Sequence, residues 1–131
     1  MDISIFGLGY VGCVGAACLA SLGHKVTGVD VSQSKVDLIN SGRPTIIEKD
    51  IEQLCYEGYA SGRLRATTDV ASAVSASDIS FIAVGTPSTR EGHLNLNYIY
   101  TVAQQIGKAL RDKKTFHVIA CLLYTSPSPR D

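Results

Sequence analysis

The sequence has no excess of charge of either sign, because twelve basic residues balance twelve acidic ones. Nucleic acids and anionic membranes favour a basic excess, so neither is expected as the main partner. No apolar run approaches the ~20 residues that a membrane span needs, and no basic segment followed by an apolar stretch and a cleavage site predicts a signal peptide. The four cysteines form no Cys-x-x-Cys pair and have no histidine at zinc-site spacing, so no metal site is predicted. This cysteine usage favours a reducing, cytoplasmic setting.

Strand-like and helix-like segments alternate along the 131 residues. Short apolar runs predict buried strands, and longer segments with apolar residues three or four apart predict helices. The predicted strands cover residues 3–6, 25–30, 63–68, 78–84 and 116–123, and the predicted helices cover residues 10–22, 32–42, 48–59, 69–77 and 99–110. Side chains suited to cap helices occur at Ser32 and at Thr68 or Asp69. The predicted fold class is α/β, a Rossmann-type doubly wound parallel sheet in a single, truncated domain.

The first predicted helix is rich in small residues, which would let it approach a sheet closely. Its periodic apolar residues are expected to form one inward face, made of Val11, Val14, Cys18 and Leu22. Cys13 and Cys18 are expected to be small buried side chains in this helix, which Gly23 is expected to end. Cys55 and Cys121 are likewise expected to have packing roles.

Three glycines at fixed spacing separate the first predicted strand from the first helix, in "GLGYVG". In such a pattern the first glycine, Gly7, makes the tight turn, and the second, Gly9, lets a pyrophosphate approach the backbone. The third, Gly12, lets the helix pack closely on the strand, so that phosphates lie at the helix N-terminus. The strand before the motif and the helix after it are the context that supports a dinucleotide site. The alternative is a glycine turn without a ligand.

Two further positions belong to the same predicted edge of the sheet. Asp30 ends the second strand, 18 residues beyond Gly12, where a carboxylate accepts hydrogen bonds from a ribose 2′-hydroxyl and repels a 2′-phosphate. NAD is therefore favoured over NADP, although Asp30 could also be an acidic residue that merely precedes the Ser32 cap. Thr86, in "VGTP" after the fourth strand, is expected to face the same crevice as Gly9, and the alternative for it is a bend in a Thr-Pro loop.

Three separated stretches, "ISIFGLGYVG", "GHKVTGVDVSQSKVDLINSG" and "DISFIAVGTPS", resemble the N-terminal domain of the nucleotide-sugar 6-dehydrogenases, the family that oxidises UDP-glucose or GDP-mannose. The resemblance runs from about residue 1 to residue 120 and favours the GDP-mannose branch, with the UDP-glucose branch as an alternative. It implies NAD contacts from the backbone of Tyr10 and Val11 and from Asp30, Lys35 and Thr86. Without the family, Lys35 could equally be a solvated lysine on an exposed helix face. Glu48 matches a family glutamate that often precedes Pro-Gly, but here "EKD" follows it.

The resemblance also implies an activity. The family oxidises the sugar C6 alcohol to a carboxylate in two hydride transfers with two NAD per sugar, works in polysaccharide biosynthesis and forms homo-oligomers. Its cysteine nucleophile lies in a "GGSC" segment of a later domain, which this chain lacks. None of the four cysteines is a credible nucleophile and none of the three histidines is expected to be catalytic, so no catalytic residue is predicted. A stand-alone NAD-sensing module that regulates a partner is the alternative from another class.

The C-terminal segment departs from the family. Residues 1–120 are predicted to be the NAD-binding domain, and residues 121–131, "CLLYTSPSPRD", replace a family loop whose threonine touches NAD. The Ser/Pro-rich end cannot form a packed element, and it resembles translated adapter sequence. Our hypothesis is that residues 121–131 are a disordered artefact of sequence assembly; a short native linker is the alternative.

Overall fold

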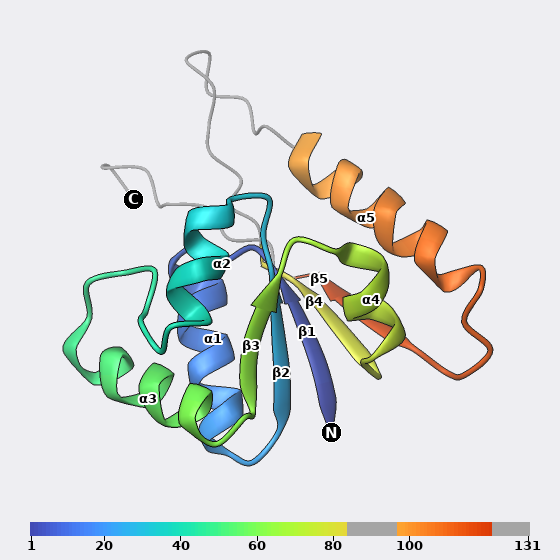
Figure 1. Cartoon of the computed structure of the whole chain (residues 1–131). Coiled ribbons are helices and arrows are strands. Elements are labelled where there is room, and N and C mark those ends of the chain that lie inside the picture. Colours follow the sequence, from blue (N-terminus) through green and yellow to red (C-terminus); the bar gives the residue numbers. More distant parts are fainter. Residues whose placement is uncertain (84–96, 122–131) are drawn as a thin grey trace, which may run out of the picture.

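The computed structural model describes residues 1–83 and 97–121 and forms one layered α/β unit (Figure 1). The elements in chain order are β1 (Asp2–Phe6), α1 (Tyr10–Ser21), β2 (Lys25–Val29), α2 (Gln33–Ile39), α3 (Lys49–Ala60), β3 (Leu64–Thr67), α4 (Val70–Ser75), β4 (Ile79–Ile82), α5 (Asn97–Leu110) and β5 (Val118–Cys121). In the part of the chain described, no helix is long and apolar enough to cross a bilayer.

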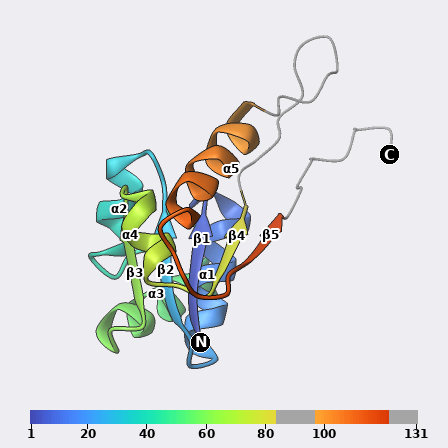
Figure 2. The same cartoon turned by 90° about the vertical axis from the view of Figure 1, so that its right-hand side faces the viewer.

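The five strands form one sheet with the order β3-β2-β1-β4-β5, in which every neighbouring pair is parallel. Figure 2 shows the strands side by side in this order, with β5 beyond β4. Ile3 of β1 lies opposite Val26 of β2 on one side and Ile79 of β4 on the other. The doubly wound, Rossmann-type sheet expected from the sequence is confirmed.

The sheet separates two apolar clusters, one on each face. The first packs β-strand residues such as Ile5 and Leu64 against α1, α2 and α3, and the second packs Phe6, Val29 and Ile82 against α4 and α5. Figure 1 shows the same division, with the first three helices on one side of the strands and the last two on the other. Alternate residues of a strand point to opposite faces, so Ile5 and its neighbour Phe6 belong to different clusters.

Several helix ends lie where the sequence predicts them. The Ser32 hydroxyl accepts a hydrogen bond from the Lys35 N–H at the start of α2, and the Asp69 carboxylate accepts one from the Ser72 N–H at the start of α4. Gly23 has a φ of +100° just after α1, as a helix-terminating glycine requires. The last strand begins at Val118, two residues later than predicted, and includes Cys121, whose side chain is exposed and not packed as expected.

The inward face of α1 differs from the prediction. Its buried residues are the small ones, namely Gly12, Cys13, Ala16, Ala17 and Ala20. Cys18 is exposed and Leu22 is 73% exposed, so the expectation that they face the core is wrong. Val11 and Val14 are only partly buried at the margin of the core. Because α1 lies very close to the sheet, only short side chains fit beneath it.

Candidate functional site

The candidate site lies at the carboxyl edge of the sheet, where the chain leaves β1 toward one face while α5, after β4, packs on the other. The end of β1 lies between its neighbours: the Gly7 N–H donates to the Val29 carbonyl at 2.8 Å, and the Ala83 N–H donates to the Phe6 carbonyl at 2.8 Å. In open parallel sheets ligands bind in the crevice at such a switch point, beyond the carboxyl ends of the strands.

At each of the three glycine positions, the structure gives a different reason for the absence of a side chain. Gly7 has a φ of +102°, which side-chain-bearing residues rarely adopt. A Cβ on Gly12 would lie 1.6 Å from the Gly7 carbonyl oxygen, so the helix touches the turn there. Among the residues that the structure describes, a Cβ on Gly9 would meet nothing within 4 Å, so on that side the backbone at Gly9 leaves room that a ligand can enter.

The N-terminus of α1 presents hydrogen-bond donors to this open space. The first bond within α1 runs from the Cys13 N–H to the Gly9 carbonyl at 2.9 Å, so the N–H groups of Tyr10, Val11 and Gly12 precede the helical ladder. Gly9 is the N-cap and has no side chain that could occupy them. These donors and the helix dipole favour a bound anion such as a pyrophosphate.

Asp30 is held in a fixed orientation beside the glycine turn. Its Oδ2 accepts a hydrogen bond from the Leu8 N–H at 2.8 Å, and its Oδ1 accepts one from the Ser32 N–H at 2.9 Å. Asp30 therefore joins the end of β2 to the middle of the glycine motif. Each carboxylate oxygen retains a second lone pair, which can accept from a ribose hydroxyl.

Three residues that the sequence interpretation missed support the turn. Leu8 is fully buried, and a Cβ on Gly28 would lie 2.6 Å from its Cδ2 atom, so Gly28 makes room for this side chain. The Thr45 hydroxyl donates to the Leu8 carbonyl at 2.7 Å from the segment between α2 and α3. The glycine inside the strand "KVTGV" is the one signal that could have been read, because a strand glycine often marks a close approach.

The other residues predicted to contact the cofactor include Lys35, Tyr10 and Thr86. Lys35 lies half-buried in the first turn of α2, five residues beyond Asp30 in the chain, and Tyr10 is 59% exposed at the start of α1. Their contacts with a dinucleotide remain predictions. Thr86 lies outside the described residues. Glu48 is the N-cap of α3, but its side chain makes no capping hydrogen bond.

Two buried thiols lie behind the site. Cys13 of α1 and Cys55 of α3 are both fully buried. A hydrogen bond from the Cys55 thiol, with smaller contributions from Thr45 and Ile46, outweighs burial and lowers the pKa of Cys13 to about 6. The same pairing raises the pKa of Cys55. Reactive cysteines need access to substrate. Because both thiols are buried, neither is a candidate nucleophile.

A polar cluster at the amino edge of the sheet contains His117. His117 Nε2 lies 2.8 Å from the Ser80 hydroxyl, and Nδ1 lies 3.0 Å from Lys113 Nζ. Burial and the Lys113 charge lower the pKa of His117. Among the residues described, no group of three or more His, Cys, Asp or Glu side chains could hold a metal ion.

Known proteins resemble this chain closely. Residues 1–121 match the family model "UDP-glucose/GDP-mannose dehydrogenase family, NAD binding domain". The chain is 56% identical to a GDP-mannose 6-dehydrogenase of Pseudomonas syringae over 119 residues, which are 91% of this chain and 27% of that protein. The chain thus spans about a quarter of the length of such relatives.

Solved structures agree with this match. A ternary complex of GDP-mannose dehydrogenase from Pseudomonas aeruginosa superposes with a TM-score of 0.91 and 51% identity, over 98% of this chain and 29% of that one. A UDP-glucose dehydrogenase from Pyrobaculum islandicum gives 0.88 and 39%, over 96% of this chain and 29% of that one. The family match covers the glycine turn, Asp30 and the whole sheet, and so this chain belongs to the UDP-glucose/GDP-mannose dehydrogenase family, of which it is the NAD-binding domain.

Proposed function

We propose that this chain forms the cofactor-binding part of an enzyme that oxidises the C6 alcohol of a nucleotide sugar to a carboxylate. The observation that carries the proposal is the glycine turn at the switch point, with open space at Gly9 and a fixed carboxylate at Asp30. GDP-mannose is the proposed sugar nucleotide, since identity is 51% to the GDP-mannose enzyme of known structure and 39% to the UDP-glucose enzyme.

The residues of this chain bind and orient the cofactor. The N–H groups of Tyr10, Val11 and Gly12 donate to the pyrophosphate, and Gly9 lets it approach the backbone. Asp30 accepts from the adenosine ribose and repels a 2′-phosphate, which selects NAD over NADP. Lys35 and Thr86 are proposed to add further contacts. Bound NAD supplies the acceptor for the hydride that leaves C6.

We propose that the chain alone binds NAD but does not turn over substrate. The thiol that captures the aldehyde is expected in a later "GGSC" segment, and Cys13 and Cys55 of this chain are buried. A purely regulatory NAD sensor is less favoured, because the relatives reported above are named as dehydrogenases. The nucleotide sugar and assembly into homo-oligomers belong to the longer protein, for which we propose a cytoplasmic location.

Titration of the purified chain with NAD and with NADP tests the cofactor proposal. We expect saturable NAD binding, much weaker NADP binding, and no NADH formation with GDP-mannose. Preference for NADP would contradict the role of Asp30, and sugar oxidation by this chain would contradict the role assigned to the later thiol. In the full-length gene product, faster oxidation of UDP-glucose than of GDP-mannose would overturn the substrate proposal alone.

We also propose that family sequence stops near residue 120 and that residues 121–131 are foreign. The support is compositional, because "TSPSPRD" is polar, rich in serine and proline, and unsuited to a packed element. Sequencing the source locus is expected to reveal a continuous frame that reaches "GGSC". A native stop codon directly after Asp131 would reject this proposal.

A further inference from the structure

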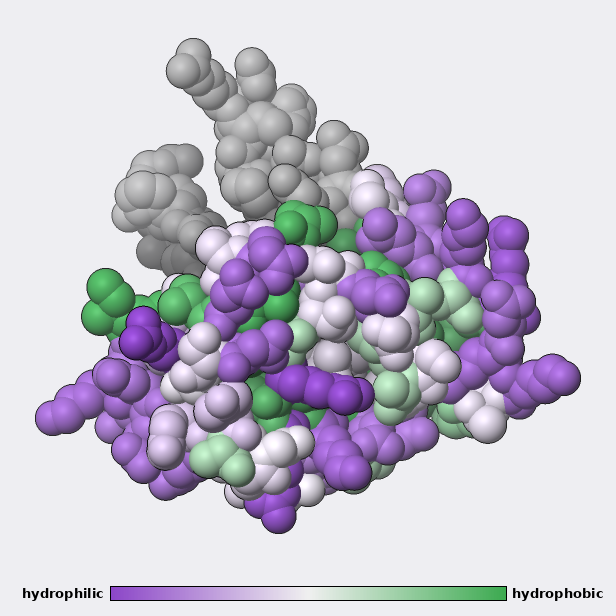
Figure 3. Space-filling view, viewed as in Figure 1, coloured by the Kyte–Doolittle hydropathy of each residue, from purple (hydrophilic) through white to green (hydrophobic). Residues whose placement is uncertain are grey.

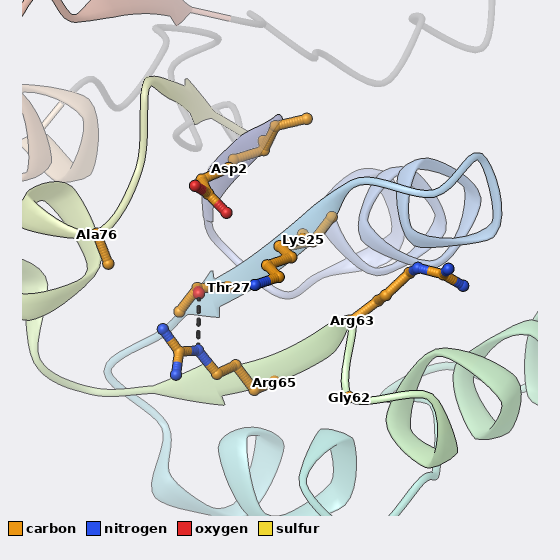
Figure 4. A pocket seen from close by; sticks show the side chains of 9 residues that line it. Asp2, Lys25, Thr27, Gly62, Arg63, Arg65 and Ala76 are labelled. Carbon is orange, nitrogen blue, oxygen red and sulfur yellow. Dashed lines mark hydrogen bonds between the residues drawn. The ribbon is translucent and has the colours of Figure 1, made fainter.

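A hollow lies at the amino edge of the sheet, at the opposite ends of the strands from the glycine turn. Its volume is about 320 Å³, and the polar side chains that line it are those of Asp2, Lys25, Thr27, Arg63 and Arg65 (Figure 4). Figure 3 shows hydrophilic side chains interspersed with neutral ones on the lower part of this side of the molecule, where these strands begin.

The strand register explains why these side chains meet. Asp2 of β1 lies opposite Lys25 of β2, and Thr27 of β2 lies opposite Arg65 of β3. Residues two apart on a strand point to the same face, so Lys25 and Thr27 share one face with their cross-strand partners. This is the face that α4 and α5 cover farther along the strands, where Val29 packs in their apolar cluster.

Hydrogen-bond donors converge on Thr27. Arg65 Nε donates to the Thr27 hydroxyl oxygen at 3.2 Å, which fixes the guanidinium and leaves the hydroxyl proton to donate elsewhere. Figure 4 shows the Lys25 amine extending along β2 toward Thr27, whereas Arg63 points away from it at the rim. An ammonium, a guanidinium and a hydroxyl thus surround one small region.

The charges in the hollow favour an anion. Three cationic side chains and one carboxylate line it, and Asp2 lies opposite Lys25, where it balances a single positive charge. Lys25 and Arg65 carry like charges on neighbouring strands and line the same hollow, so an anion between them would be attracted to both. A planar guanidinium donates two parallel hydrogen bonds to a phosphate, which makes an oxyanion the best match.

We propose that this hollow, formed by Lys25, Thr27 and Arg65 at the amino edge of the sheet, binds a phosphate-class oxyanion. The ligand is either free phosphate or the phosphate group of a small metabolite, for which a cavity of about 320 Å³ has room. The site does not depend on the proposed dehydrogenase function, since it lies at the other edge of the sheet from the cofactor residues.

The test is a titration of the ¹⁵N-labelled 131-residue chain with inorganic phosphate, at fixed pH and ionic strength, followed by amide chemical shifts. We expect saturable shifts centred on Lys25, Thr27 and Arg65. Phosphate at the N-terminus of α1 would move the amides of Gly9 and Tyr10 instead, so the two edges are distinguished. A parallel titration with ribose 5-phosphate compares free phosphate with a phosphate carried on a metabolite, and tighter binding of either compound identifies the source.

Matched variants separate a built site from general surface charge. The double change Lys25→Gln and Arg65→Gln is expected to weaken phosphate binding at least tenfold. The control double change, Lys108→Gln and Arg111→Gln, removes the same charge from exposed positions in and after α5 and is expected to leave binding within twofold. Both pairs are exposed, so folding is retained, which circular dichroism verifies. Equal losses in the two double variants, or shifts that never saturate, would overturn the proposal.

Discussion

The contact between Gly12 and Gly7 makes Gly12→Ala the sharpest single test of the candidate site. The added Cβ would lie 1.6 Å from the Gly7 carbonyl oxygen and 2.8 Å from its carbonyl carbon. Both are backbone atoms, so no flexible side chain can move aside. The start of α1 or the glycine turn itself must be displaced.

The expected loss of stability follows from this overlap. Inserting extra atoms into a packed site costs typically about 1–3 kcal/mol, and a backbone overlap this deep belongs at or above the upper end, so we expect about 3 kcal/mol or more. Gly15→Ala is the control in the same helix, because its Cβ would meet only Ile5 Cδ1, at the ordinary distance of 3.9 Å. A helix-interior alanine is favoured over glycine by roughly 0.5–1 kcal/mol, so this variant is expected to be slightly stabilised.

The assay is urea unfolding followed by circular dichroism, which gives the free energy of unfolding for each variant. If the free energy of unfolding of Gly12→Ala lies within about 1 kcal/mol of that of the parent chain, position 12 accommodates a side chain as an ordinary position does. The reasoning from close contact is then refuted. A loss of stability in Gly15→Ala equal to that in Gly12→Ala would refute it too, because the effect would then be general to α1.

Gly9→Ala separates the cofactor role from the structural one. Its Cβ would meet none of the atoms of residues 1–83 and 97–121 within 4 Å, so stability is expected to fall by no more than about 1 kcal/mol, from the poorer N-cap. The same Cβ occupies the space assigned to the pyrophosphate, so calorimetry is expected to show at least tenfold weaker NAD binding. NAD affinity equal to that of the parent chain would mean that the cofactor does not approach at Gly9.

Three further predictions concern charge, thiol access and pH. Asp30→Asn removes the charge that repels a 2′-phosphate and is expected to narrow the preference for NAD over NADP about tenfold, as measured by calorimetry; an unchanged ratio would contradict the selectivity argument. Iodoacetamide is expected to label Cys18 in the folded chain but Cys13 and Cys55 only after unfolding, which peptide mass spectrometry detects, and fast native labelling of the buried pair would contradict it. Because burial and a neighbouring lysine lower the pKa of His117, the unfolded chain binds its proton more readily, and stability is expected to fall as the pH drops below about 6.5. His117→Gln should lessen that slope in urea midpoints compared between about pH 5 and about pH 8, and an unchanged slope would exclude His117 as its source.

The features that the sequence predicted correctly are those set by local rules. The alternation of strands and helices was readable because parallel strands buried on both faces are nearly continuous apolar runs, as in "ISFI" of β4. The caps at Ser32 and Asp69 were readable because the side chain bonds to a backbone N–H only three residues away. The glycine motif could be placed between a strand and a helix for the same reason, because the motif and both elements are adjacent in the chain.

The features that the sequence did not reveal depend on contacts between distant segments. The Thr45 hydroxyl reaches the Leu8 carbonyl across 37 residues, and the Asp30 carboxylate reaches the Leu8 N–H across 22. The periodicity of apolar residues in the sequence does not reveal such long-range hydrogen-bonded pairs. The lowered pKa of Cys13 likewise depends on Cys55, on a different helix, so composition alone could not reveal it.

The close contact between Gly12 and Gly7 explains both why the predicted inward face of α1 is wrong and how the cofactor site forms. Choosing apolar residues at helical spacing from Val11 selected Cys18 and Leu22, which assumes that the helix lies at an ordinary distance from the sheet. The contact of Gly12 with Gly7 brings the start of α1 onto the turn, and little room remains below the helix. Positions four and eight residues beyond Gly12 must then be small, and they are Ala16 and Ala20. In a glycine-motif helix of this kind, the buried stripe is therefore found by counting from the third glycine, because the packing that opens the pyrophosphate site also selects the core face.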